Sequence, residues 1–158
     1  GNNNPYCQDN LTSWLDWKLL DTHRDIFEFC KYMIHFRHNH PAIRKSIAQS
    51  HCGFPPISQH GVTPWDDNFT QDSKIVCTMF AGHDEKQDSE DIVYLAVNPY
   101  WESILIHLPK LPKPLQWHLA VDTSLSDTSG CTFEKEQMSH VGNDYLIGAR
   151  TVVVLTAH

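Results

Sequence analysis

The second half of the chain holds six short apolar runs separated by polar segments. They lie at 74–81, 91–98, 103–108, 116–122, 145–148 and 150–156. Within the second run, Val93, Leu95 and Val97 alternate with residues of the opposite face. A period of two with short connections is typical of antiparallel strands. The sequence therefore predicts a mainly β fold, an antiparallel β-sandwich, for this half of the chain.

One amphipathic helix is predicted ahead of these strands. Asp21 or Thr22 can cap its first turn, and Pro41 forces its end because proline has no backbone N–H to continue the helix. Between these limits, apolar side chains recur at the spacing of one buried helix face. The residues assigned to that face are Ile26, Phe29, Cys30, Met33, Phe36 and Arg37.

The segment that follows the helix is rich in glycine and proline. Residues 42–72 include Gly53, Pro55, Pro56 and Gly61, which interrupt regular structure. This composition predicts a connector that contains at most a short helical turn.

The amino-acid composition argues against some classes of binding partner. The 158 residues include 12 Lys or Arg and 19 Asp or Glu, a formal charge of −7. This balance argues against a phosphate-backbone partner, and no apolar run approaches the roughly 20 residues of a membrane-spanning helix. We therefore expect neither a nucleic-acid nor a membrane partner. The five cysteines lack Cys-x-x-Cys spacing, which favours free thiols in a reducing compartment.

For each group of candidate catalytic or metal-binding residues, a position in solvent or in the core is favoured over a functional role. His35, His38 and His40 share the helix end, yet no carboxylate or cysteine completes a ligand set, so a solvated helix face is favoured over a metal site. The acidic clusters at 66–67 and 84–91 lie in predicted polar loops, where charge is usually solvated. The thiols of Cys30 and Cys77 are expected in the core. We expect no metal and no cofactor.

The first ten residues concentrate amides, a phenol and a carboxylate, with aromatic rings directly behind them. Amides and carboxylates hydrogen-bond sugar hydroxyls and aromatic rings stack on sugar faces, but an Asn-rich turn explains the same composition equally well. The chain begins at Gly1 with no initiator Met and no signal-peptide pattern. We therefore expect it to belong to a longer polypeptide.

These residues carry a resemblance to a known family. The run GNNNPYCQDN at 1–10, continuing to SWLDW at 13–17, closely resembles the isoamylase-type glycogen-debranching enzymes of the α-amylase superfamily. Position 11 is Leu where the family usually has Glu. Further similarity lies at Phe36-Arg37, at 40–44, at His60-Gly61-Val62, from Val93 to Asp122-Thr123, and at 150–155.

The resemblance implies a division of the chain. Residues 1–50 would be the last loop and final helix of a catalytic (β/α)8 barrel, 51–72 a connector and 73–158 a C-terminal β-sandwich domain. The family cleaves α-1,6 branch linkages of glycogen-like glucans with retention, using carboxylates on barrel strands that would precede Gly1. No catalytic residue can be carried over. The implied partners are a branched α-glucan and the barrel of the same polypeptide, in the cytoplasm.

Four residues of the opening loop would face the glucan: Asn3, Asn4, Tyr6 and Asp9. By this interpretation the parent protein is an enzyme and this chain alone is inactive. The alternative is an autonomous glucan-binding or protein-interaction module, which would display a line of exposed aromatic rings. Tyr100, Trp101 and Trp117 are the candidates, although Trp117 alternates with apolar residues and fits the core better.

Overall fold

The computed structural model describes residues 6–125 and 131–158. Its helical elements are α1 (Leu19–Thr22), α2 (Arg24–Asn39), η1 (Pro41–Ile43) and η2 (Lys135–Gln137). Its strands are β1 (Ile57–His60), β2 (Val76–Asp84), β3 (Ser89–Asn98), β4 (Ile104–His107), β5 (Trp117–Asp122), β6 (His140–Val141), β7 (Asp144–Ile147) and β8 (Thr151–Ala157).

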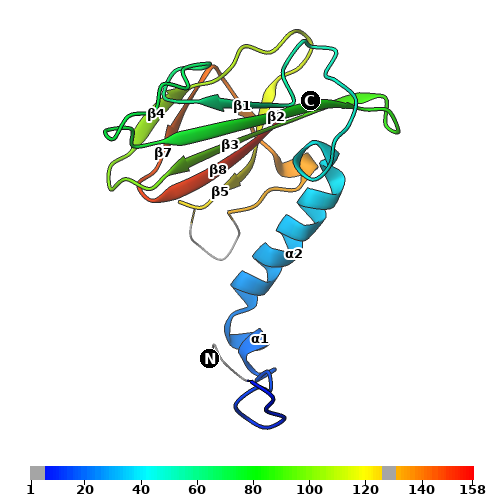
Figure 1. Ribbon diagram of the computed structural model, residues 1–158, viewed down its shortest axis with the longest axis vertical. Helices are drawn as coiled ribbons and strands as arrows, with labels where there is room; N and C mark the ends of the chain where they lie inside the picture. The colour runs from blue at the N-terminus through cyan, green and yellow to red at the C-terminus, as the bar shows by residue number, and fades with distance from the viewer. Residues whose placement is uncertain (1–5, 126–130) are drawn as a thin grey trace.

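The strands form two antiparallel sheets that pack together (Figure 1). The larger sheet has the order β1-β2-β3-β8-β5-β6, and β4 pairs with β7 in the smaller one. Side chains from both sheets share one core, in which Met79, Tyr94, Ile106 and Ile147 are fully buried. The predicted antiparallel β-sandwich is confirmed, and all six apolar runs coincide with strands.

Two strands were not predicted. β1 lies inside the glycine- and proline-rich segment expected to be a connector and pairs with β2 along its whole length. Its sequence, ISQH, offers only one apolar side chain, so it has no alternating pattern to detect. β6 has only two residues and pairs with β5.

Asn98 joins the two sheets at the end of β3. Its side-chain N–H groups donate to the carbonyls of Glu102, at 2.9 Å, and Gly148, at 2.8 Å, while its Oδ1 accepts from the Tyr100 N–H at 3.0 Å. The residue is 1% exposed. Because buried backbone groups need partners, this one amide fixes the loop after β3 against the end of β7.

Helix α2 packs on the outer face of the larger sheet. Phe36 is buried against Val93 and Val154, and Phe29, Tyr32 and Met33 lie beside it. These four helix residues recur at i, i+3, i+4 and i+7, the spacing of one helix face. In β3, Val93 therefore points to the helix, while Tyr94 points to the inter-sheet core.

The helix differs from its prediction in two respects. A break at His23, with φ −119° and ψ 42°, separates α1 from α2, so neither Asp21 nor Thr22 caps the long helix. Ile26 and Cys30 are exposed rather than in the core. The end before Pro41 is confirmed. Phe29, Met33 and Phe36 of the predicted face do pack on the sheet, whereas Ile26, Cys30 and Arg37 do not. The helix has two apolar stripes, and the sequence does not say which of them meets the sheet.

Buried His60 gives the sandwich a pH dependence. Its Nδ1 accepts the Trp65 backbone N–H at 2.8 Å, and its Nε2 lies 2.8 Å from the Ser58 hydroxyl. Burial lowers the pKa of His60, although the carboxylate of Asp67 acts in the opposite direction. The folded state thus keeps the ring neutral while the unfolded chain takes up a proton below about pH 6.5.

We therefore expect the free energy of unfolding to fall as pH drops through about 6.5 toward 5, because the unfolded state then binds more protons. The measurement is the urea midpoint at several pH values. His60→Gln keeps a neutral side chain and should flatten this slope, whereas His107→Ala, at an exposed histidine, should not. Equal slopes in the wild type and His60→Gln would contradict the assignment.

Candidate functional site

The predicted glucan-facing loop lies at the far end of the molecule from the sandwich (Figure 1). Of its four residues, Asn3 and Asn4 lie outside the described residues. Tyr6 is 80% exposed. Asp9 is also exposed, and its Oδ1 accepts the Trp14 indole N–H at 2.7 Å. The structure thus brings Asp9 together with an aromatic ring and leaves the Tyr6 phenol in solvent.

Local hydrogen bonds hold this loop in shape. The Ser13 hydroxyl donates to the Gln8 carbonyl at 2.5 Å, and the Thr12 N–H donates to the Asn10 side chain at 2.9 Å. The Asn10 side-chain amide in turn donates to the Gln8 side chain at 2.9 Å. These bonds engage the side chains of Gln8, Asn10 and Ser13 within the loop, whereas the Trp14 ring is 58% exposed.

Helix α2 has a second apolar stripe that nothing in the described chain covers. Ile26, Phe27, Cys30 and Ile34 recur at i, i+1, i+4 and i+8, which places them on one helix face, away from the side that packs on the sheet. Ile26 and Ile34 are 58% and 59% exposed. We call these four residues the uncovered face.

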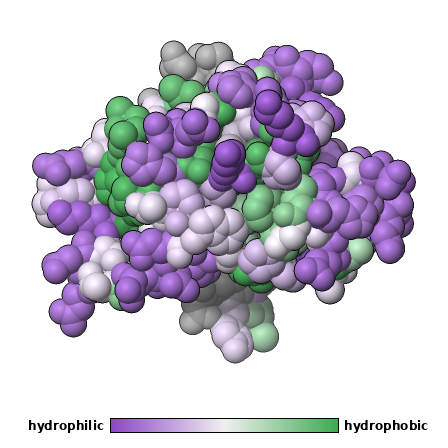
Figure 2. Space-filling view, turned by 90° about the horizontal axis from the view of Figure 1, so that it is seen from above, coloured by the Kyte–Doolittle hydropathy of each residue, from purple (hydrophilic) through white to green (hydrophobic). Residues whose placement is uncertain are grey.

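The loop and α1 extend the uncovered face toward the N-terminus. Ten of the nineteen large exposed apolar side chains in the described residues precede residue 40. At the opposite end of the molecule, apolar areas lie among polar residues (Figure 2). Beyond the uncovered face, the exposed apolar side chains of this end include Leu11, Trp14, Leu15, Trp17, Leu19 and Leu20. Exposed apolar side chains gathered in one part of a molecule are typical of an interaction site.

A buried carboxylate sets the position of α2. Asp91 accepts from His40 Nδ1 and from the Ala42 backbone N–H, both at 2.7 Å, and it is 7% exposed. The expectation that the charges of 84–91 are solvated was wrong for Asp91, which is buried and begins the strand run predicted at 91–98. The helix end is thus tied to the centre of the larger sheet.

Comparison with known proteins finds several relatives of the chain. Isoamylase 1, chloroplastic, of Arabidopsis thaliana is 30% identical over 135 residues, which cover 83% of this chain and 16% of that protein. The isoamylase of Pseudomonas amyloderamosa is 26% identical over 147 residues, covering 93% of this chain and 18% of the relative. The glycogen debranching enzyme of Erwinia tasmaniensis is 51% identical over 45 residues, 28% of this chain and 6% of that enzyme.

The chain is homologous to isoamylases and glycogen debranching enzymes. It spans less than a fifth of the length of the curated relatives it matches. No protein-family model matches it. In the described part of this debranching-enzyme homologue, no helix has the length and apolar character needed to cross a bilayer. All five cysteines lie in the described residues, and each is free of disulfide bonds.

The aromatic residues on the sandwich do not form a line. Trp117 is 4% exposed and its indole N–H donates to the Pro109 carbonyl at 2.9 Å, so it belongs to the core, as expected. Trp101 is 65% exposed, and its ring lies 4.0 Å from that of half-buried Tyr100. Of the three candidate rings, only Tyr100 and Trp101 thus lie together at the surface.

The helix histidines do not form a ligand set. His35 and His38 are exposed, and His40 is held by Asp91. The structure instead brings together three residues that sequence reasoning missed, His51, His83 and Glu90. These residues come from separate segments of the sequence. Only the pairing register of β2 and β3 would have predicted that His83 lies opposite Glu90.

Proposed function

We propose that this chain is the C-terminal part of a glycogen debranching hydrolase that cleaves α-1,6 branch linkages of glycogen-like glucans in the cytoplasm. In this proposal residues 1–50 end the catalytic barrel, 51–72 connect it to the next domain while contributing β1 to the larger sheet, and 73–158 form the rest of the β-sandwich. The catalytic carboxylates belong to the barrel. The chain itself has a structural role, in which the sandwich supports the barrel through α2.

The main observation in support of this proposal is the uncovered face of α2. A helix that buries one apolar stripe on a sheet and exposes a second one is suited to lie between two bodies. The sandwich occupies the first stripe through Phe36 and its neighbours, so the second, around Ile34, is left for the barrel. Burying a side chain such as Phe27 or Ile34 contributes about 1.5–3 kcal/mol.

The chemistry of the described carboxylates supports a non-catalytic role. Retaining hydrolysis needs two carboxyl groups about 5–5.5 Å apart across the scissile bond, one of them free to attack it. Asp91 is the most buried carboxylate near α2, and both of its oxygens are engaged, one by His40 and one by Ala42. Both oxygens thus bind the end of the helix, which is a structural use of this carboxylate.

The opening loop supplies the proposed contact with substrate. Asn3, Asn4, Tyr6 and Asp9 would border the glucan cleft, with the amides and the phenol hydrogen-bonding glucose hydroxyls. The bond from Trp14 to Asp9 orients that carboxylate and holds an indole ring beside it. An aromatic ring next to a carboxylate suits a sugar, which has both an apolar face and a polar rim.

The proposal is tested by incubating amylopectin with the purified chain and with a longer polypeptide that carries the preceding barrel. We expect release of linear glucan chains, measured as new reducing ends, from the longer polypeptide only. Release by the 158-residue chain alone would overturn the proposal. Tight binding of glycogen by the chain alone, lost in Trp101→Ala, would instead favour an autonomous glucan-binding module.

A further inference from the structure

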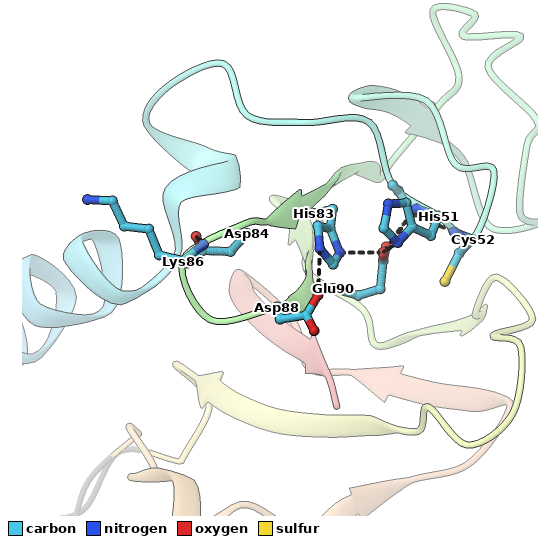
Figure 3. Close-up of polar contacts among 8 residues, drawn as sticks. His51, Cys52, His83, Asp84, Lys86, Asp88 and Glu90 are labelled. Atoms are coloured by element: carbon cyan, nitrogen blue, oxygen red, sulfur yellow. Dashed lines mark hydrogen bonds and ion pairs between the residues drawn. The ribbon is translucent and has the colours of Figure 1, made fainter.

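A cluster of metal-ligating side chains lies beside the β2–β3 hairpin, on the sandwich and away from the uncovered face (Figure 3). His83 on β2 and Glu90 on β3 are directly opposed in the strand register. His51 reaches them from the segment after η1. In the described residues this is the single group of three such side chains whose ligand atoms all lie within 4.8 Å of one another.

The fold places His51 by backbone contacts. The segment that carries it runs beside β2, where the His83 N–H donates to the Ala48 carbonyl at 2.9 Å. Gly82 permits this approach, because a Cβ at that position would overlap the Ile47 side chain. The segment before His51 is therefore held against β2 at Gly82 and His83.

The separations approach those of a tetrahedral zinc site. Metal–ligand bonds of 2.0–2.1 Å at tetrahedral angles put neighbouring ligand atoms about 3.3 Å apart. Glu90 Oε1 lies 3.3 Å from His83 Nδ1 and 3.9 Å from His51 Nδ1. The His51 side chain is 72% exposed, so it can close the remaining gap without moving the core.

Neighbouring groups orient two of the three ligands. The Ser50 hydroxyl donates to Glu90 Oε2, and the His51 backbone N–H donates to Oε1 at 3.0 Å. Asp88 Oδ1 lies 3.3 Å from His83 Nε2, the carboxylate–histidine arrangement that leaves Nδ1 free to ligate a metal.

We propose that His51, His83 and Glu90 bind one divalent transition-metal ion of the Zn²⁺ type, with water completing the coordination. Two imidazoles and one carboxylate form a ligand set that Zn²⁺ favours, whereas Mg²⁺ and Ca²⁺ prefer oxygen ligands alone. The ion would tie the segment after η1 to the β2–β3 hairpin. This site is independent of the proposed catalytic role, because it involves neither the barrel nor the glucan.

The test is titration of the untagged chain with Zn²⁺ by calorimetry, together with the absorption spectrum of the Co²⁺ form. We expect one bound ion and a tetrahedral Co²⁺ spectrum. His51→Ala removes an exposed ligand with little effect on folding, and it should weaken binding by at least about tenfold. Glu90→Gln should also weaken it, with circular dichroism checking that this variant is folded.

The matched control is His107→Ala. His107 pairs with Asp144 at an exposed position that offers only two ligands, so its loss should leave zinc affinity unchanged. A second control, His118→Ala, removes a ring that stacks on His158 at 4.0 Å. Failure of the wild type to bind Zn²⁺, or equal affinity in the wild type and His51→Ala, would overturn the proposal.

Discussion

Replacing Asp91 with Ala is expected to lower the free energy of unfolding by about 3 kcal/mol, because it strands two buried donors. Both Asp91 oxygens accept hydrogen bonds at 2.7 Å, one from the His40 ring and one from the Ala42 backbone. The carboxylate side chain is 7% exposed, so water cannot replace it without opening the contact between helix and sheet. The measurement is chemical denaturation followed by circular dichroism.

The control for this variant is the exposed pair His107 and Asp144. Its two side chains are 52% and 53% exposed, so Asp144→Ala should cost no more than about 1 kcal/mol. Asp91→Asn retains one acceptor for the Ala42 N–H and should fall between the two. If Asp91→Ala and Asp144→Ala cost the same, the anchor of α2 has been misassigned.

Introducing charge on the uncovered face is expected to have little effect on the stability of the isolated chain and a large effect on the activity of the longer polypeptide. In the isolated chain, the double variant Phe27→Asp, Ile34→Asp should change the stability of the sandwich by no more than about 0.5 kcal/mol per site, because both side chains are exposed. It should also reduce self-association, measured by sedimentation, since it interrupts an apolar surface.

In the longer polypeptide with its barrel, the same variant should lower branch-cleaving activity by at least about tenfold, because two carboxylates would be buried without partners, at a cost of several kcal/mol. Leu146→Asp is the matched control, since Leu146 is 61% exposed on β7 and far from α2. Full activity in the double variant would show that the barrel does not cover this face.

The strands were predictable because each apolar run has a local pattern. Val93 and its neighbours alternate over a whole strand, and Pro41 marks the helix end by chemistry that needs no tertiary context. The sequence also placed Trp117 in the core. By contrast, β1 has one apolar residue, and its strand conformation depends on pairing with β2.

Features that depend on distant segments could not be read from the sequence. Cys30 lies on one of two apolar stripes of α2, and only the packed sheet decides which stripe is buried. The group of His51, His83 and Glu90 requires the segment after η1 to lie beside β2, an arrangement with no local signal. The burial of Asp91 could not be predicted either, because its partners His40 and Ala42 lie about fifty residues earlier in the chain.

Hydrogen–deuterium exchange tests the central claim most directly. The measurement compares the exchange rates of the backbone amides of α1 and α2, Leu19–Asn39, in two samples. One sample is the chain alone and the other is the longer polypeptide that includes the barrel. The account predicts slow exchange near Phe36 in both samples, and protection around Ile26 to Ile34 that increases strongly only when the barrel is present. Equal exchange of α1 and α2 in the two samples would contradict it.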